Sequence, residues 1–190
     1  MGPRAGPRQG QMLRGDAMND VALTILPESR DDAEAIERLH ERTFGPGRYA
    51  KTAYRLREQV PHNIELSFTA RIGTLLVGSV WLSPIRIGDH KALLLGPLTV
   101  EPAFRERGIG QALIARALKE AAIAAHRLVL LVGDEPYYSK AGFRRVPEDR
   151  VVMPGPVDPA RVLIAELVDG AFDGVSGRVR AEWERCQSAP

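Results

Sequence analysis

The sequence of 190 residues has only one cysteine, Cys186, so no disulfide can form within one chain. A single thiol fits a reducing compartment. No apolar run approaches the about 20 residues that a helix needs to cross a bilayer. The arginines near the start of the sequence are not followed by the apolar core of a secretory signal. We therefore predict a cytoplasmic protein with no membrane partner.

The sequence also lacks a strong net charge of either sign and any pattern of residues with the spacing of metal ligands. The formal net charge is only +2, so no global field argues for a nucleic-acid partner. One cysteine and the scattered His40, His62, His90 and His126 give no metal-ligand spacing, so we predict no metal site. We interpret the histidines as surface or ordinary packing residues. The 44% hydrophobic and 26% charged residues are typical of a globular domain with a core.

Composition divides the chain into three segments. Residues 1–18 are rich in Gly, Pro and Arg and have few large apolar groups, which predicts a disordered N-terminal tail. One globular domain is predicted over 19–170. The remainder, 171–190, is interpreted as a C-terminal tail in which Val179, Trp183 and Cys186 could line one face of a short helix.

Hydrophobic periodicity predicts alternating strands and helices in the domain. Strands are expected over 21–25, 64–71, 75–83, 91–100, 128–132, 143–146 and 162–167. Helices are expected over 33–43, 49–59, 108–125 and 136–140, the first after a capping box that begins at Ser29. Gly96-Pro97 marks an edge or a bulge, because proline has no N–H to donate within a sheet. Three meandering strands followed by a strand–helix–strand unit predict an α/β (α+β) fold: a mixed sheet of about seven strands, with helices on both faces.

The strand over 91–100 leads into the loop Arg105-Glu106-Arg107-Gly108-Ile109-Gly110, which opens the long helix. Unpaired N–H groups at a helix start suit a phosphate or pyrophosphate. The two glycines let the backbone approach such a ligand, and the two arginines can add charge-assisted hydrogen bonds. The Rossmann fingerprint fails because Leu113 replaces its third small residue, and the Walker A lysine is absent.

The loop resembles the Gln/Arg-x-x-Gly-x-Gly/Ala loop of the GNAT N-acetyltransferase superfamily. Downstream, Tyr138-Ser-Lys-Ala-Gly142-Phe143 resembles the second motif of that superfamily, Tyr-x-x-x-Gly-Phe. The order of strand, loop, helix, strand and second motif is similar to that of the YhbS-like branch. The resemblance spans residues 21–168. It implies a three-layer GNAT-type fold in which a bulged fourth strand splays away from the fifth.

The same resemblance implies acetyl-CoA as cosubstrate and assigns residues to it. Leu98, Thr99 and Val100 would offer backbone groups to the pantetheine arm, and the Leu98 amide would polarise the thioester carbonyl. Seven backbone amides would hold the pyrophosphate: those of Arg105, Glu106, Arg107, Gly108, Ile109, Gly110 and Gln111.

Direct attack of an amine on the thioester is the implied reaction, with Tyr138 protonating the departing thiolate. The base is harder to assign. Asp134 and Glu65 are the best-placed acids, although Asp134 also suits the N-cap of the helix over 136–140. Tyr137 and Trp81 are interpreted as packing residues, Trp81 in the core or in a cleft wall.

The resulting hypothesis is an acetyl-CoA-dependent N-acetyltransferase for a primary amine of a small molecule or a protein. A homodimer is compatible with it. The lack of an evident base leaves one alternative from another class: a non-catalytic acyl-CoA-binding sensor or interaction module with the same fold.

Overall fold

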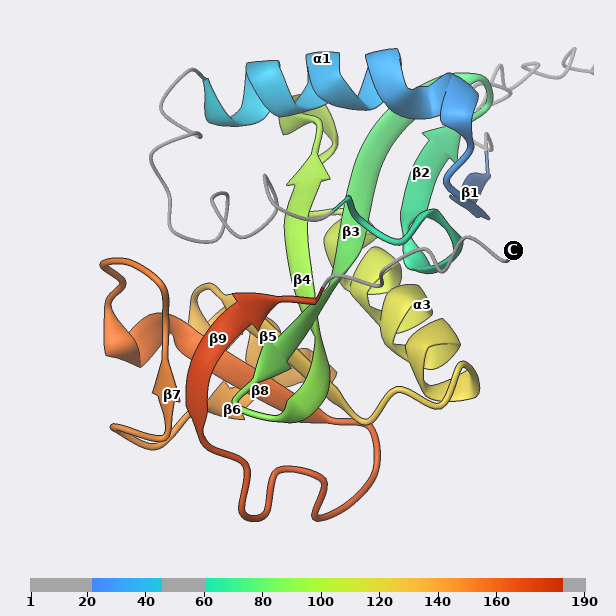
Figure 1. Cartoon of the computed structure of the whole chain (residues 1–190). Helices are drawn as coiled ribbons and strands as arrows, with labels where there is room; N and C mark the ends of the chain where they lie inside the picture. Colours follow the sequence, from blue (N-terminus) through green and yellow to red (C-terminus); the bar gives the residue numbers. More distant parts are fainter. Residues whose placement is uncertain (1–21, 46–60, 183–190) are drawn as a thin grey trace, which may run out of the picture.

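The computed structural model describes residues 22–45 and 61–182. They form one strongly curved sheet and the helices that pack on it (Figure 1). Its strands are β1 (Leu23–Pro27), β2 (Phe68–Ile72), β3 (Leu75–Ile87), β4 (His90–Val100), β5 (Leu128–Val132), β6 (Arg144–Arg145), β7 (Val151–Val152), β8 (Val162–Glu166) and β9 (Gly177–Ala181). Seven of them follow the order β1-β2-β3-β4-β5-β8-β6, while β9 joins β3 and β7 joins β9. On the seven-strand path only β4 and β5 are parallel. The predicted mixed sheet of about seven strands is confirmed.

Helices lie on both faces of the sheet, as predicted (Figure 1). The α-helices are α1 (Ala33–Phe44), α3 (Ile109–Ile123) and α4 (Glu135–Tyr138). Short 3-10 helices are η1 (Arg30–Asp32), η3 (Ile64–Leu66), η4 (Pro102–Phe104), η5 (Ser139–Ala141) and η6 (Pro159–Arg161). Within the two described stretches, no helix is long and apolar enough to span a membrane. The helix expected over 49–59 lies outside the described residues.

The two long helices cover opposite faces of β3. The predicted stripe of α3 is buried in the main core, because its members recur one helical turn apart: Ile109, Leu113, Ala117 and Ala121. On the other face, Ile36 and Leu39 of α1 pack with Leu76 and Trp81. The expected capping box at Ser29 is present at the start of η1, which leads directly into α1: the Ser29 N–H donates to Asp32 Oδ2 at 2.9 Å.

A bulge lies in β4 where it pairs with β3. Val80 pairs with Leu98 and Leu82 pairs with Leu95, so β4 uses one more residue than β3 between these pairs. The extra residue falls at Gly96-Pro97, which confirms the predicted bulge. The bulge turns the second half of β4 relative to the first.

The beginning of the strand predicted over 64–71 is wrong. Residues Ile64–Leu66 form η3 instead, because Asn63 Oδ1 accepts from the Glu65 N–H at 2.9 Å and starts a helical turn. The strand β2 begins only at Phe68. Local capping by a side chain thus overrides the apolar pattern at this point.

The C-terminal segment also differs from the prediction of a tail with a short helix. Ala171, Phe172 and Val175 are buried in a second core cluster, and Gly177–Ala181 forms β9. This strand pairs with β3 from Ile85 to Ile87, beyond the predicted end of β3 at residue 83. The proposed partners of Val179 on a helix face, Trp183 and Cys186, lie outside the described residues.

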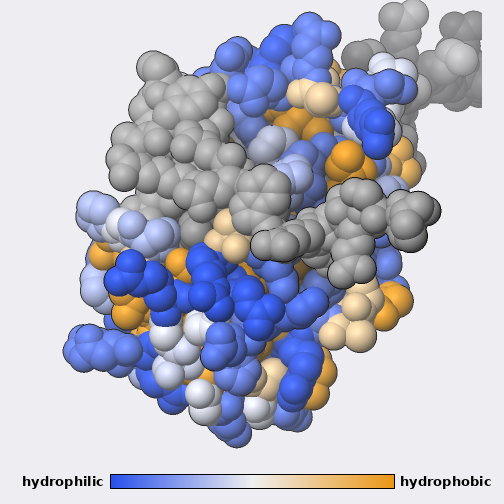
Figure 2. Space-filling view, viewed as in Figure 1, coloured by the Kyte–Doolittle hydropathy of each residue, from blue (hydrophilic) through white to orange (hydrophobic). Residues whose placement is uncertain are grey.

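The surface of the described part is mainly hydrophilic on the face shown in Figure 2. Hydrophilic residues cover α1 and β9, and hydrophobic areas on this face are small and separate. The strand β9 contributes the charged Arg178 and Arg180, which are both exposed or nearly so.

Candidate functional site

The two central parallel strands separate soon after they meet. Pairing between β4 and β5 is confined to Leu93 with Val129 and Leu94 with Leu130. Beyond Leu94, the described part of the chain pairs β4 with β3 alone, and Figure 1 shows β4 rising away from β5. The predicted bulged and splayed fourth strand is confirmed. The separation leaves one backbone edge of β4 for an extended ligand.

The three predicted pantetheine residues lie on this segment. Leu98, Thr99 and Val100 pair with Val80, Ser79 and Gly78 of β3, so their other backbone edge faces the gap. Leu98 and Val100 are half-buried, while Thr99 is buried. The structure therefore brings these backbone groups to the position that an extended amide chain would require.

The loop after β4 turns sharply into α3. Glu106 and Gly108 have φ angles of 62° and 77°, in the left-handed region that a glycine adopts without strain. The first hydrogen bond of α3 runs from the Ala112 N–H to the Gly108 C=O at 3.0 Å. The amides of Ile109 and Gly110, like that of Gln111, precede this bond and lie at the positive end of the helix. This cluster of amides suits an anionic group.

The arginines of the loop lie at its surface. Arg105 and Arg107 are exposed, and the Arg107 guanidinium lies 5.3 Å from the centre of the Phe104 ring. Arg105 Nε lies 3.4 Å from the Val100 carbonyl oxygen. Both positive charges therefore flank the amide cluster, where they raise the local potential for an anion.

Gly110 also has a packing role in the structure. A Cβ atom on Gly110 would overlap the Tyr137 hydroxyl, and Tyr137 Cζ would lie 3.4 Å from it. Burial raises the pKa of this tyrosine above its usual range. Gln111 Nε2 also donates to the Tyr137 carbonyl oxygen at 2.8 Å. The glycine thus serves close packing of α4 on α3, in addition to any approach of a ligand.

Tyr138 occupies a different environment from its neighbour. Its ring lies directly over Gly133, where a Cβ atom would be 2.8 Å from Tyr138 Cδ2. It meets Phe143 edge-on, with ring centroids 6.0 Å apart, and packs against the main core. Tyr137 and Tyr138 therefore direct their rings to different neighbours, Tyr137 to α3 and Tyr138 to the end of β5.

The two acids considered as bases are at the surface. Asp134 occupies the N-cap position of α4, yet its carboxylate is 76% exposed and lies 3.3 Å from Arg161 Nε. Glu65 is exposed on η3. Neither carboxylate is held in a buried environment that would activate it as a base.

A polar and aromatic cluster on the α1 face of the sheet was missed by the sequence reasoning. It combines Glu28, His40, His62 and Trp81, which are far apart in the sequence and form no motif. The His62 ring stacks on Trp81 with centroids 4.0 Å apart and planes inclined by 4°. His62 Nε2 lies 2.8 Å from Glu28 Oε1.

The same cluster connects to β4. The His40 ring meets Trp81 edge-on at 4.7 Å, and His40 Nε2 lies 3.2 Å from Ser79 Oγ. Ser79 Oγ is in turn 2.6 Å from Thr99 Oγ1. A buried chain of polar groups therefore joins α1 to one of the predicted pantetheine residues.

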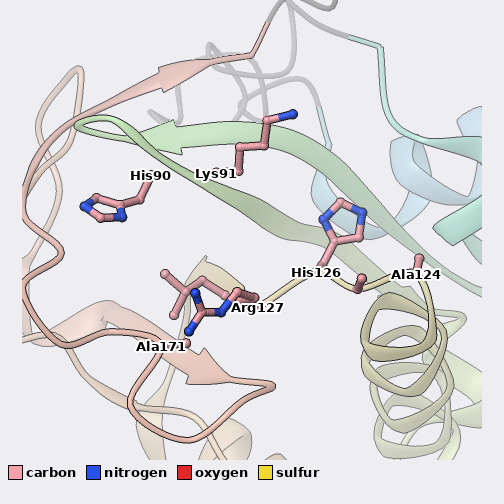
Figure 3. A pocket seen from close by; sticks show the side chains of 8 residues that line it. His90, Lys91, Ala124, His126, Arg127 and Ala171 are labelled. Carbon is pink, nitrogen blue, oxygen red and sulfur yellow. The ribbon is translucent and has the colours of Figure 1, made fainter.

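A cavity of ≈ 370 Å³ lies elsewhere, at the other ends of β4 and α3 (Figure 3). His90 and Lys91 border it at the start of β4, and His126 and Arg127 border it after α3. It contains none of the predicted site residues. The candidate site therefore consists of the free backbone edge of β4 beyond Leu94, the loop that opens α3 and the cluster over Trp81.

Comparison with known proteins gives consistent matches. Residues 64–145 match the acetyltransferase (GNAT) domain family. The chain is 27% identical over 159 residues to the uncharacterized N-acetyltransferase YhbS of Escherichia coli strain K12, covering 83% of this chain and 95% of that protein.

Two solved structures extend the comparison. The crystal structure of E. coli YhbS in complex with CoA matches with a TM-score of 0.73 at 24% identity, over 85% of this chain and 91% of that one. A GNAT family acetyltransferase from Brucella melitensis, in complex with acetyl-CoA, matches with a TM-score of 0.56 at 28% identity, over 80% and 99% of the two chains.

Proposed function

We propose that the chain is an acetyl-CoA-dependent N-acetyltransferase, because residues 64–145 match the acetyltransferase (GNAT) domain family and the chain is 27% identical to YhbS over 159 residues. Its acceptor is a primary amine of a small molecule or of a protein. The observation that carries this proposal is the backbone edge of β4 beyond Leu94, which ends at the amide cluster of α3. The Brucella relative, which is 28% identical, is a complex with acetyl-CoA and supports the choice of donor.

In this proposal the cosubstrate lies along β4 and ends on the loop. Its pantetheine amides pair with the backbone of Leu98, Thr99 and Val100. The pyrophosphate accepts hydrogen bonds from the amides of residues 105–111, and the flanking guanidinium groups of Arg105 and Arg107 add positive charge.

The chemistry is a direct transfer. The free amine attacks the thioester carbonyl carbon, and the developing oxyanion accepts a hydrogen bond from the Leu98 amide. The C–S bond then breaks, and the Tyr138 hydroxyl gives its proton to the thiolate before solvent reprotonates the tyrosine. We also propose a cytoplasmic location, which fits the single cysteine. The homodimer stays a prediction, and gel filtration of the purified chain would test it.

Calorimetry with acetyl-CoA tests the donor site. The wild-type chain should bind it, and Gly108→Trp should abolish binding by placing an indole over the amide cluster. Gly174→Trp is a matched control: both glycines have a left-handed φ, 77° and 72°, and open space at the Cβ position. Both variants therefore carry similar backbone strain, and only Gly108→Trp should lose the ligand.

Release of CoA thiol separates the enzyme from the sensor. The assay uses acetyl-CoA with a panel of putrescine, spermidine, phenethylamine and peptides with free N-termini. Amine-dependent thiol release supports the transferase. Tight binding of acetyl-CoA without release across the whole panel would favour the non-catalytic module instead.

A further inference from the structure

The end of β1 and the segment before η3 bring a carboxylate and an imidazole together over Trp81. Glu28 follows β1 directly, and its side chain is only 4% exposed. The His62 side chain is 19% exposed and lies between Glu28 and the Trp81 ring. The carboxylate is therefore shielded from water, while the imidazole keeps access to it.

Backbone hydrogen bonds hold this pair in place. The Asn63 N–H donates to the Leu82 carbonyl oxygen at 2.7 Å, which fixes the chain next to His62 on β3 beside Trp81. The Glu28 N–H donates to the Ser67 carbonyl oxygen at 2.8 Å. The chain beside His62 is thus anchored on β3, and Glu28 is anchored just before β2, so both members are held in place as a preorganised catalytic group requires.

The hydrogen bond assigns distinct roles to the two imidazole nitrogens. Because Glu28 Oε1 accepts from Nε2, the proton is held on Nε2 and the lone pair is on Nδ1. A buried carboxylate beside the ring stabilises the imidazolium that forms when Nδ1 takes a proton. The arrangement is that of a base oriented by a carboxylate.

Stability alone does not explain the carboxylate. Glu28 Oε2 is buried, and it has no hydrogen-bond partner within residues 22–45 and 61–182. A buried carboxylate with one oxygen unsatisfied destabilises a fold. A positive charge that develops on the adjacent ring during turnover would offset this cost.

The pair lies over Trp81 of β3, the strand that pairs with the part of β4 that the proposed function uses. Trp81 lies between Val80 and Leu82, whose partners on β4 flank the Gly96-Pro97 bulge. On the same face, Ser79 contacts Thr99 of the predicted pantetheine segment. The other titratable groups of the cluster are on α1: His40 against Trp81, and Glu37 with its carboxylate 4.0 Å from His40 Nδ1.

We propose that His62 is the general base of the acetyl transfer and that Glu28 is the residue that positions it, with Trp81 as the stacking platform. This proposal rests on the proposed function. His62 Nδ1 takes one proton from the ammonium form of the acceptor and passes it to solvent. The neutral amine then forms the C–N bond as the C–S bond breaks. The tyrosine gives its proton to the thiolate. The amine nitrogen releases its second proton to solvent, and solvent reprotonates the tyrosine. The net products are the acetamide, CoA thiol and one proton.

The test measures kcat/KM for the amine of the panel that wild type uses best, as a function of pH. His62→Gln should lower it by about 100-fold or more, a typical contribution of a general base. In wild type the rate should rise with pH, as general-base catalysis predicts. In His62→Gln the remaining rise should move to the higher pH at which the amine itself deprotonates. His90→Gln, on an exposed histidine at the other end of β4, is the control and should match wild type.

Two further variants separate chemistry from packing. Glu28→Gln keeps the size and an accepting oxygen but removes the charge, so it should lower kcat and change the pH profile while acetyl-CoA affinity stays the same. In His62→Ala the slot over Trp81 is vacated, and added imidazole should restore part of the turnover. Thermal unfolding of each variant shows whether the fold is retained.

The outcomes distinguish this proposal from the one on which it rests. If wild type acetylates an amine and both His62→Gln and Glu28→Gln retain its rate and pH profile, the base is elsewhere and the dyad is overturned. If wild type releases no thiol with any amine, the proposed function fails, and the dyad fails with it.

Discussion

The hydroxyl of Tyr137 lies in the space that a Cβ atom on Gly110 would occupy. This contact places α4 directly on the first turn of α3, and the hydrogen bond from Gln111 to the Tyr137 carbonyl fixes the same two elements. Because interiors are packed to near-crystal density, no side chain at position 110 can be added without moving the tyrosine. The helix α4, which contains the first residue of the Tyr-x-x-x-Gly-Phe motif, is therefore packed directly against the start of α3.

Gly110→Ala should destabilise the fold by about 1–3 kcal/mol, the usual cost of overpacking. Tyr137→Phe removes the overlapping oxygen and leaves Cζ at 3.4 Å, an acceptable contact. The double variant Gly110→Ala/Tyr137→Phe should therefore recover most of the lost stability. Urea unfolding of the four proteins in this mutant cycle measures the coupling.

Gly108→Ala provides the comparison for this cycle. It should cost about 1–2 kcal/mol, because alanine is strained in the left-handed conformation at this position. Nothing lies near its Cβ position, so Tyr137→Phe should not relieve that cost. Equal rescue of both alanine variants would show that the hydroxyl is not the obstacle at Gly110.

Tyr138→Phe should lower kcat by roughly ten- to a thousandfold with little change in acetyl-CoA affinity, as loss of a general acid predicts. Tyr137→Phe is the necessary comparison, because the structure places its hydroxyl beside Leu98 and the amide cluster. Steady-state kinetics with calorimetry for both variants decides between them. A larger fall in kcat for Tyr137→Phe would transfer the acid role to that residue.

Stability at low pH should depend on Glu166. Its carboxylate accepts from the Phe172 N–H at 2.9 Å and from Arg144, and these contacts lower its pKa below the ordinary value. As pH falls, the unfolded state therefore takes up a proton on Glu166 before the folded state does. The contribution of this carboxylate to the free energy of unfolding is full above the unfolded pKa and is lost as pH falls through the folded pKa. Glu166→Gln should therefore flatten the loss of stability with acid below about pH 4.5.

Urea unfolding between pH 7 and pH 3 measures this effect. Glu148→Gln, on an exposed glutamate outside the strands, is the control and should leave the acid limb unchanged. An acid limb in Glu166→Gln as steep as that of wild type would mean that the contacts of this carboxylate do not set the acid sensitivity.

Much of the proposed donor site was predictable because it is contiguous in the sequence. The strand over 91–100, the loop and the α3 stripe from Ile109 to Ala121 obey local rules of periodicity and helix initiation. Even the bulge at Gly96-Pro97 follows from a local property, the missing N–H of proline. The assigned roles of Leu98 to Gln111 and of Tyr138 and Asp134 stay predictions for the experiments above.

The C-terminal strand was not predictable from its own residues. Gly177–Ala181 has a weak pattern with two arginines, and pairing with the extended end of β3 and with β7 makes it a strand. Strand propensity depends strongly on such context. The 3-10 helix at Ile64–Leu66 was missed for the opposite reason, since a single Asn63 side chain outweighs the apolar pattern.

The sequence by itself determined the strands and helices that build most of the mixed sheet and the bulge at Gly96-Pro97, because each depends on residues close together in the chain, whereas the splay of the fourth strand was implied by the family resemblance. Only the tertiary structure decided that Tyr137 closes on Gly110, and that Glu28 and His62 meet over Trp81. These contacts join residues from different strands and helices, and their geometry depends on how β1, β3 and α4 pack. Side-chain chemistry across such distances leaves no periodic signal in a single sequence, since it is created only when the elements come together.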